Sequence, residues 1–190
     1  MISLILGLGN IGERYLRSRH NLGFEVVAAS AVLLKAGFDS TGDTYEAALQ
    51  KSEQRRIVLA RPTTYVNRSG QAANALLQEY DLDPSQMLVV VDDFNLPTGI
   101  LRLRRGGSDG GHNGLASIIE ALDTIEFPRL RMGIGPLPED VDAADFVLGQ
   151  FEQSELADVE RMIKVATEAA IFTISHHLDE AMSKYNVNPA

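Results

Sequence analysis

Five polar residues lie in or beside short turns, and their side chains suit one kind of chemistry. Asn10, Asn67 and Asn113 carry amides, His20 carries an imidazole and Asp92 carries a carboxylate. An amide offers a neutral donor and a neutral acceptor whose protonation does not change with pH. Several amides beside one histidine therefore indicate a site that holds carbonyl groups and moves a proton. Such a site would be hydrolytic and not redox.

A nucleotide cofactor is the first alternative. Residues 7–12, Gly-Leu-Gly-Asn-Ile-Gly, match the dinucleotide-binding pattern G-x-G-x-x-G and follow an expected strand. In that fold the last glycine opens an apolar helix at once, whereas here residues 13–20 form a charged loop. The acidic residue that would bind the ribose is also missing, because Glu25 falls within the helical pattern. We therefore expect no nucleotide cofactor.

Structural and metal-binding interpretations stay open for the individual residues. Asp92 and Asp93 follow a buried strand and could bind Mg²⁺, cap a loop or orient a histidine. A magnesium site needs converging carboxylates, and the other acidic residues are scattered, so we expect no metal. His20 taken alone is typical of a capping or solvated residue, and residues 112–114 are typical of a helix N-cap.

The spacing of apolar residues predicts strands alternating with helices. Strands are expected at 2–8, 45–50, 56–60, 87–91, 100–104 and 130–135, and helices at 21–37, 69–80 and 113–122. Residues 87–91 are all apolar, as expected for a strand that is covered on both faces. From Asp142 onward the pattern is that of an acidic amphipathic helix. We expect a single three-layer α/β domain over residues 1–190, with a mostly parallel, mixed central sheet flanked by helices.

Length and composition set broader limits. The chain has 190 residues, is 45% hydrophobic and lacks cysteine, which excludes disulfides, thiolate zinc sites and a cysteine nucleophile. The first apolar run is too short for a signal peptide, and no later stretch approaches the roughly 18 apolar residues of a membrane span. We expect a soluble, cytoplasmic protein.

The net charge of −9 is unevenly distributed. Residues 1–131 hold 14 Lys/Arg and 15 Asp/Glu, whereas residues 132–190 hold 3 and 11, so the acidity belongs to the C-terminal part. The cations of the first part are nearly all arginine, which favours forked contacts with phosphate. Arginines at alternate positions are equally typical of the solvent face of a strand, so both interpretations remain open.

Four segments in order closely resemble the bacterial peptidyl-tRNA hydrolase family. They are residues 7–23, residues 62–70, residues 91–97, and residues 110–115 followed by 129–135. The resemblance covers essentially the whole chain, and the joint occurrence of the segments is highly specific. It implies a monomeric α/β domain that hydrolyses the ester between a peptide and the terminal ribose of tRNA, and so frees tRNA from stalled or dropped-off chains.

The resemblance also implies roles at single positions. His20 matches the catalytic base of the family and Asp92 matches its partner. Asn10, Asn67 and Asn113 match amides that line the peptide end of the site. Asn10 is expected to hold the peptide carbonyls, and Asn67 and Asn113 are expected to support the peptide and the oxyanion.

A second group of positions matches the tRNA side of the site. Tyr15 and Tyr65 match aromatic positions where a ring can stack on the last adenine, and Gly111 belongs to a glycine loop that faces the substrate. The basic patch for the acceptor-stem phosphate is matched by Arg102, Arg104 and Arg131. The expected partner is thus the acceptor stem and 3′ end of peptidyl-tRNA, with no cofactor, no metal and no membrane.

Four positions depart from the family pattern. Ile11 and Thr98 stand where the family usually has proline, Asp109 puts an acid into the glycine loop, and Pro136 follows the Gly-Ile-Gly segment unusually. None of these departures removes a catalytic group. A second hypothesis, from another functional class, is a non-hydrolytic RNA-binding module on the same fold, and the intact catalytic positions argue against it.

Overall fold

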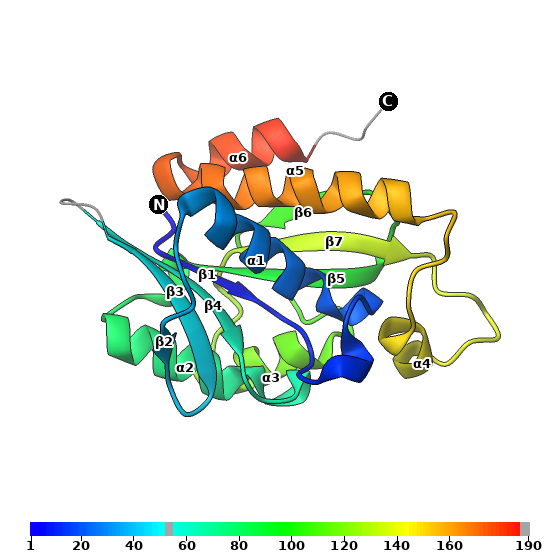
Figure 1. The fold of residues 1–190 in the computed structure, drawn as a ribbon, viewed down its shortest axis with the longest axis horizontal. Helices are drawn as coiled ribbons and strands as arrows, with labels where there is room; N and C mark the ends of the chain where they lie inside the picture. Colours follow the sequence, from blue (N-terminus) through cyan, green and yellow to red (C-terminus); the bar gives the residue numbers. More distant parts are fainter. Residues whose placement is uncertain (52–54, 187–190) are drawn as a thin grey trace.

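A mixed sheet runs through residues 1–51 and 55–186, which are the residues that this computed structural model describes (Figure 1). The strands are β1 (Leu4–Gly7), β2 (Ser40–Thr41), β3 (Tyr45–Lys51), β4 (Arg56–Pro62), β5 (Met87–Pro97), β6 (Leu101–Arg104) and β7 (Arg129–Gly135). Within the described residues their order is β2-β3-β4-β1-β5-β7-β6. The pairs β4/β1, β1/β5 and β5/β7 are parallel, and the outer pairs are antiparallel. The expected mixed α/β architecture is confirmed, with its parallel strands at the centre.

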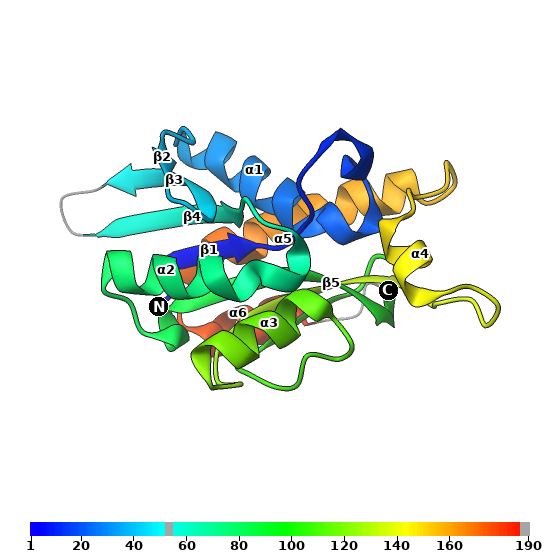
Figure 2. The same ribbon diagram turned by 90° about the horizontal axis from the view of Figure 1, so that it is seen from below.

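Helices cover both faces of the sheet, as Figures 1 and 2 show. One face carries α1 (Leu22–Leu34), α5 (Leu156–Ser175) and α6 (Leu178–Tyr185), and the other carries α2 (Ser69–Tyr80) and α3 (Asn113–Leu122). The short helix α4 (Ala143–Leu148) lies beyond the carboxyl ends of the parallel strands (Figure 1). None of the helices in residues 1–51 and 55–186 has the length and apolar character needed to cross a membrane.

The apolar run of β5 belongs to two separate cores. Successive side chains of a strand point to opposite faces of the sheet. Leu88 and Val90 therefore pack in the core on the side of α1 and α5, whereas Val89 and Val91 pack in the core on the side of α2 and α3. All four are buried. This arrangement explains why the central strand has no polar residue before Asp92.

Two expected elements differ from the structure. The prediction of a single acidic helix from Asp142 onward is wrong, because three helices, α4, α5 and α6, occupy this region. Asp142 caps α4 by accepting hydrogen bonds from the backbone N–H groups of Ala144 and Asp145, and the chain leaves the helix at Gly149. The expected strand at 87–91 is also too short, since β5 continues to Pro97 with a shift of register after Asp93.

The glycine run at 7–12 does not open a helix. Two short 3-10 turns, Glu13–Tyr15 and Arg19–Asn21, come first, and α1 begins only at Leu22. The charged-loop interpretation of this segment is therefore confirmed. The second 3-10 turn carries His20 and leads directly into α1, so the position of α1 fixes the position of that histidine.

Gly7 and Gly23 allow α1 to lie directly against β1. A Cβ atom on Gly7 would stand 2.1 Å from the carbonyl oxygen of Gly23, and a Cβ atom on Gly23 would stand 2.4 Å from the backbone nitrogen of Leu8. These are backbone atoms of packed elements, which cannot move aside as a flexible side chain can. Close contact between the two backbones therefore requires glycine on both sides.

Replacing Gly23 by alanine tests this contact. Gly23→Ala is expected to lower the free energy of unfolding by about 1 to 3 kcal/mol, because overpacking forces the backbone apart. Chemical denaturation measures the change. The matched control is Val32→Ala on the same helix, where the side chain is 76% exposed; it should stay within about 0.5 kcal/mol of the parent. Equal effects of the two substitutions would contradict the argument.

Candidate active site

The candidate site is a cavity beside residues 92–94 of β5, beyond the point where its neighbour β1 ends at Gly7. Ligands commonly bind to open α/β sheets outside the carboxyl ends of strands. The volume of the cavity is about 290 Å³. The lining consists of His20, residues 92–94, residues 109–113, Leu115, residues 142–144 and Val147. Residues from the second 3-10 turn, the central strand, the glycine loop, the start of α3 and α4 thus converge from distant parts of the chain.

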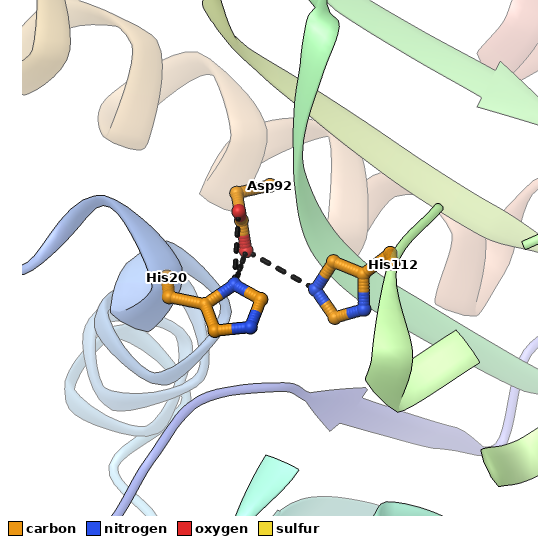
Figure 3. Close-up of side chains that lie close together, drawn as sticks. All are labelled: His20, Asp92 and His112. Atoms are coloured by element: carbon orange, nitrogen blue, oxygen red, sulfur yellow. Dashed lines mark hydrogen bonds and ion pairs between the residues drawn. The ribbon is translucent and has the colours of Figure 1, made fainter. Parts of the chain in front are cut away.

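His20 and Asp92 form a buried hydrogen-bonded pair (Figure 3). Nδ1 of His20 lies 2.9 Å from Oδ1 and 3.0 Å from Oδ2 of Asp92. The two residues are 5% and 3% exposed. An ionised carboxylate can only accept hydrogen bonds, so the proton of the neutral imidazole sits on Nδ1. Nε2 is then left with a free lone pair, which is what a general base requires.

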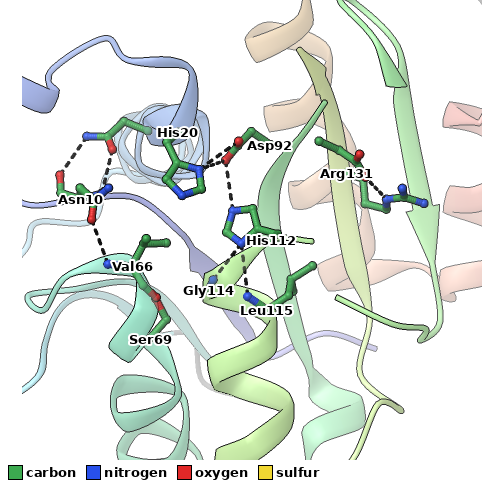
Figure 4. Close-up of polar contacts among 11 residues, drawn as sticks. Asn10, His20, Val66, Ser69, Asp92, His112, Gly114, Leu115 and Arg131 are labelled. Atoms are coloured by element: carbon green, nitrogen blue, oxygen red, sulfur yellow. Dashed lines mark hydrogen bonds and ion pairs between the residues drawn. The ribbon is translucent and has the colours of Figure 1, made fainter. Parts of the chain in front are cut away.

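His112 is a member of the site that the sequence analysis did not assign to it. Its Nδ1 accepts hydrogen bonds from the backbone N–H groups of Gly114 (3.0 Å) and Leu115 (3.3 Å) at the start of α3 (Figure 4). The N-cap interpretation of residues 112–114 is therefore confirmed for this side chain. Because Nδ1 is an acceptor, the proton of the neutral ring sits on Nε2, which lies 3.3 Å from Oδ1 of Asp92.

One signal in the sequence could have pointed to His112. Histidine is an uncommon N-cap residue, since Ser, Thr, Asp and Asn are preferred there. A histidine at this position, within a segment shared with the family, is a candidate for a second function. The structure shows that one ring caps a helix and contacts the carboxylate that holds His20.

The pKa values of the pair move in opposite directions. Burial acts to raise the pKa of Asp92, but the charges of His20 and His112 and their hydrogen bonds hold it well below its usual range. Burial acts to lower the pKa of His20, but the charge of Asp92 and its hydrogen bond outweigh burial and raise the pKa above 6.5. Asp92 is therefore ionised at neutral pH, and His20 becomes a base as the pH rises through its raised pKa.

His20, Asp92 and His112 are also close enough to hold a metal ion, because one ligand atom from each lies within 4.8 Å of the others. The hydrogen bonds of His112 argue against this use. Nδ1 already accepts two backbone N–H groups, so a metal on Nε2 would require the ring to lose both protons. The arrangement fits proton transfer better than metal coordination.

Asn10 is held so that one end of its amide remains available. Its backbone N–H donates to Oδ1 of Asn21 (2.8 Å), and its backbone carbonyl accepts from Nδ2 of Asn21 (3.0 Å). Its own Oδ1 accepts the backbone N–H of Val66 at 3.0 Å (Figure 4). The contact with Val66 fixes which end of the Asn10 amide is oxygen, because a backbone N–H can only donate. The Nδ2 group is therefore the donor that Asn10 can offer to a ligand.

The other two asparagines are placed differently. Asn113 is exposed, lines the cavity and begins α3 directly after His112. Asn67 is exposed but does not line the cavity; it follows Val66, which binds Asn10. Gly111 does line the cavity, and its φ of +86° lies in a region that favours glycine. The structure thus brings Asn113 and Gly111 to the cavity, whereas Asn10 and Asn67 are not among its lining residues.

The expected tRNA-binding residues lie outside the cavity. Tyr65 is 52% exposed, and Tyr15 is half-buried beneath the guanidinium of Arg14. Arg104 is exposed at the end of β6. Arg131 is half-buried, and its Nε donates to Oδ2 of Asp93 (Figure 4).

The pairing of β6 with β7 sets the arrangement of the arginines. Arg102 lies directly opposite Arg131, and Arg104 lies directly opposite Arg129. Like charges in directly opposed positions destabilise a sheet, so this set of cations needs compensation. Arg129 is buried and donates to backbone carbonyls in residues 107–108 and 125–127. Arg102 is half-buried and donates to the carbonyl of Asn186.

Two of the four departures from the family pattern contact the glycine loop or β7. Asp109 lines the cavity, and its Oδ1 accepts the backbone N–H of Gly111 at 2.8 Å, so its carboxylate closes the loop on itself. The hydroxyl of Thr98 donates to the carbonyl of Gly135 at 3.2 Å. Ile11 is 40% exposed, and Pro136 follows a cis peptide bond.

Comparison with known proteins decides the family. The family model described as peptidyl-tRNA hydrolase matches residues 4–190. The chain belongs to this family. Peptidyl-tRNA hydrolase of Chloroflexus aggregans is 45% identical over 184 residues, which cover 96% of this chain and 98% of that protein. Peptidyl-tRNA hydrolase of Synechocystis is 44% identical, with 96% and 95% covered.

A solved structure of the peptidyl-tRNA hydrolase family supports the fold as well. The crystal structure of peptidyl-tRNA hydrolase from Acinetobacter baumannii matches with a TM-score of 0.91 at 32% identity, covering 98% of this chain and 95% of that one. The resemblance that the four segments indicated is therefore confirmed by sequence and by structure. Membership of the peptidyl-tRNA hydrolase family makes the chain an enzyme, a hydrolase that acts on peptidyl-tRNA.

The raised pKa of His20 can be tested by removing the charge of Asp92. In Asp92→Asn, burial remains and the attraction is lost, so the pKa of His20 should fall below 6.5. NMR titration of the assigned imidazole signals measures this. The matched control is Asp93→Asn, because Asp93 pairs with Arg131 and makes no contact with His20 in the described residues. An unchanged titration midpoint in Asp92→Asn would contradict the pairing.

Proposed function

We propose that the chain hydrolyses the ester of peptidyl-tRNA with His20 as general base and Asp92 as its partner. The observation that carries the proposal is the buried pair beside the cavity, with Nδ1–H bound to a carboxylate and Nε2 free. The same pair favours hydrolysis over RNA binding alone, since binding needs no oriented base. Family membership supports the choice of substrate.

The proposed reaction proceeds without an acyl-enzyme. Nε2 of His20 takes a proton from water as the water oxygen adds to the ester carbonyl carbon. The imidazolium then gives this proton to the ribose oxygen as its bond to that carbon breaks, which yields a peptide carboxylic acid and tRNA with a free hydroxyl. Asp92 stabilises the imidazolium and keeps the ring in the correct tautomer. General-base catalysis of this kind contributes about 10² to 10⁴ in rate.

The amides would hold the peptide and the developing negative charge. Asn10 has its Nδ2 free to donate to a peptide carbonyl, because its Oδ1 is already used by Val66. Asn113 lies at the first position of α3, where the helix dipole favours negative charge, and we assign it to the oxyanion. An oxyanion donor is worth about 10² to 10³ in turnover. Asn67, which does not line the cavity, would support the peptide beyond it.

The tRNA would extend from the cavity over the exposed aromatic and basic residues. Tyr15 and Tyr65 would stack on the terminal adenine, and Gly111 would contact the substrate in the cavity. The acceptor-stem phosphate would bind to Arg102, Arg104 and Arg131, whose register in β6 and β7 supports a shared anion site. We further propose that the enzyme acts as a monomer in the cytoplasm; sedimentation of the purified protein tests the first point and fractionation of cells the second.

The central prediction concerns His20→Ala. Deacylation of N-blocked aminoacyl-tRNA should fall by about 10² or more, because the proposed general base is lost, while tRNA binding persists. The parent enzyme should keep its activity in EDTA. The matched control is His177→Ala, which replaces an exposed histidine outside the cavity and should leave turnover unchanged.

Three outcomes separate the alternatives for this reaction. Normal turnover in His20→Ala would overturn the assignment of the base. Loss of parent activity in EDTA that returns with added Mg²⁺ or Zn²⁺ would show a metal requirement. Absence of parent activity with intact tRNA binding would favour the RNA-binding alternative.

The arginine patch predicts a salt-dependent affinity. Each phosphate contact adds to the slope of log Kd against log salt, so Arg104→Ala should reduce that slope by about one and weaken binding of all tRNAs similarly. Titration of labelled tRNA at several salt concentrations measures the slope. Arg161→Ala is the control, because Arg161 is exposed on α5 and pairs only with Asp158 in the described residues. An unchanged slope in Arg104→Ala would place the phosphate elsewhere.

A further inference from the structure

Arg19, the residue before His20, forms a half-buried ion pair with Glu155 at the start of α5. Its Nη1 and Nη2 lie 2.8 Å and 2.7 Å from Oε1 and Oε2 of Glu155, which is a forked, bidentate contact. Arg19 is 7% exposed and the side chain of Glu155 is 24% exposed, so the pair is partly shielded from water. The hydrogen bond from Arg19 is the main cause that lowers the pKa of Glu155. The pair joins positions 136 residues apart in the chain.

The same guanidinium lies between two aromatic rings. Its central carbon is 4.6 Å from the ring centroid of Phe146 and 4.5 Å from that of Phe151. Phe146 belongs to α4, and Phe151 belongs to the segment between α4 and α5. Cation–π contacts of this kind strengthen when they are shielded from water. Arg19 therefore contacts α4, the following segment and α5 with one side chain.

Backbone contacts also join the His20 turn to residues 146–155, and we call this set of contacts the junction. The backbone N–H of Arg19 donates to the carbonyl of Gly149 at 2.9 Å, and Ser18 forms an antiparallel bridge with Gln150. The turn that carries His20 is thus attached to residues 149–150 on its backbone and to Glu155 through the side chain of Arg19.

The junction fixes two sides of the cavity relative to each other. His20 lines one side, and Ala143, Ala144 and Val147 of α4 line another. α4 has only six residues, which is too few for a helix to be stable by itself in water. Its position therefore depends on tertiary contacts, and Phe146 on Arg19 is one that reaches directly to the His20 turn.

We propose that Arg19 is a positioning residue for ester hydrolysis, which holds α4 and the His20 turn in one arrangement through Glu155, Phe146 and Phe151. This inference rests on the proposed function, because its effect is transmitted through His20. Arg19 itself contacts no substrate, since its guanidinium is enclosed by the carboxylate and the two rings.

Arginine is required at this position for a geometric reason. A guanidinium is planar, so it can fork onto a carboxylate and stack between rings at the same time, whereas the lysine ammonium is a point charge that does neither. Arg19→Lys keeps the charge and removes this geometry. Arg19→Lys should therefore lower kcat about as much as Arg19→Met does. Both should differ clearly from Arg161→Lys, a conservative exchange at an exposed position.

The test measures steady-state kinetics of the full-length variants on N-blocked aminoacyl-tRNA. Arg19→Lys should lower kcat by about 10- to 100-fold, since a misplacement of about 1 Å can cost this much, while Kd for uncharged tRNA stays unchanged. Hydrogen exchange should accelerate in residues 143–155. The matched control is Arg161→Lys, which replaces an exposed arginine that also pairs with a carboxylate and should leave kcat unchanged.

A purely structural role of Arg19 gives a different result. It would lower the melting temperature but leave kcat intact at temperatures where circular dichroism shows full folding, and that result would overturn the proposal. If Arg19→Lys does not fold, Phe146→Leu serves instead, because it keeps the Glu155 pair and removes only the contact to α4. A several-fold loss of kcat in folded Phe146→Leu supports the proposal, and normal kcat overturns it.

Failure of this inference can be distinguished from failure of the proposed function. If His20→Ala is inactive while folded Arg19→Lys has normal kcat, the general base stands and the positioning role of Arg19 is wrong. If His20→Ala is active, the assignment of the base is wrong, and so is a role for Arg19 that acts through it.

Discussion

The site depends on one buried carboxylate that two imidazole rings share. Asp92 accepts from Nδ1 of His20 and from Nε2 of His112, so each ring is confined to one neutral tautomer. The parallel strand β5 delivers the carboxylate to the edge of the sheet, the 3-10 turn before α1 delivers one ring, and the first turn of α3 delivers the other. A charge buried this deeply is tolerated only with such partners. The three elements around it must therefore meet in one arrangement.

The sequence could predict the elements and the pair, but not the contacts made by tertiary packing. Repeating apolar patterns placed most helices and strands, and ordered motifs named His20 and Asp92. The second contact of His112 could not be foreseen, because a capping pattern is local and says nothing about a carboxylate 20 residues earlier. The apolar spacing from Asp142 onward predicts one continuous helix, whereas the cap at Asp142 and the exit at Gly149 separate α4 from the helices that follow.

Basic and acidic residues are distributed unevenly between β6 and β7 and the C-terminal helices. Leu103 and Leu130 of β6 and β7 pack in the core beneath α5, so the alternate positions, which carry the arginines, point to the face of α2 and α3. The acidic residues of the C-terminal part lie largely on α4, α5 and α6 instead. The cations on β6 and β7 can therefore attract a polyanion locally, although the net charge of the chain is −9. The overall charge alone would have argued against an RNA substrate.

The double use of His112 ties the local folding of α3 to the chemistry of the site. Nδ1 of His112 accepts the first N–H groups of the helix, so the ring proton sits on Nε2, which faces Asp92. If the first turn of α3 frays, the cap is released, the imidazole can change its tautomer, and the carboxylate loses a donor in the same event. The first turn of α3 therefore has to be formed for Asp92 to keep both of its imidazole partners.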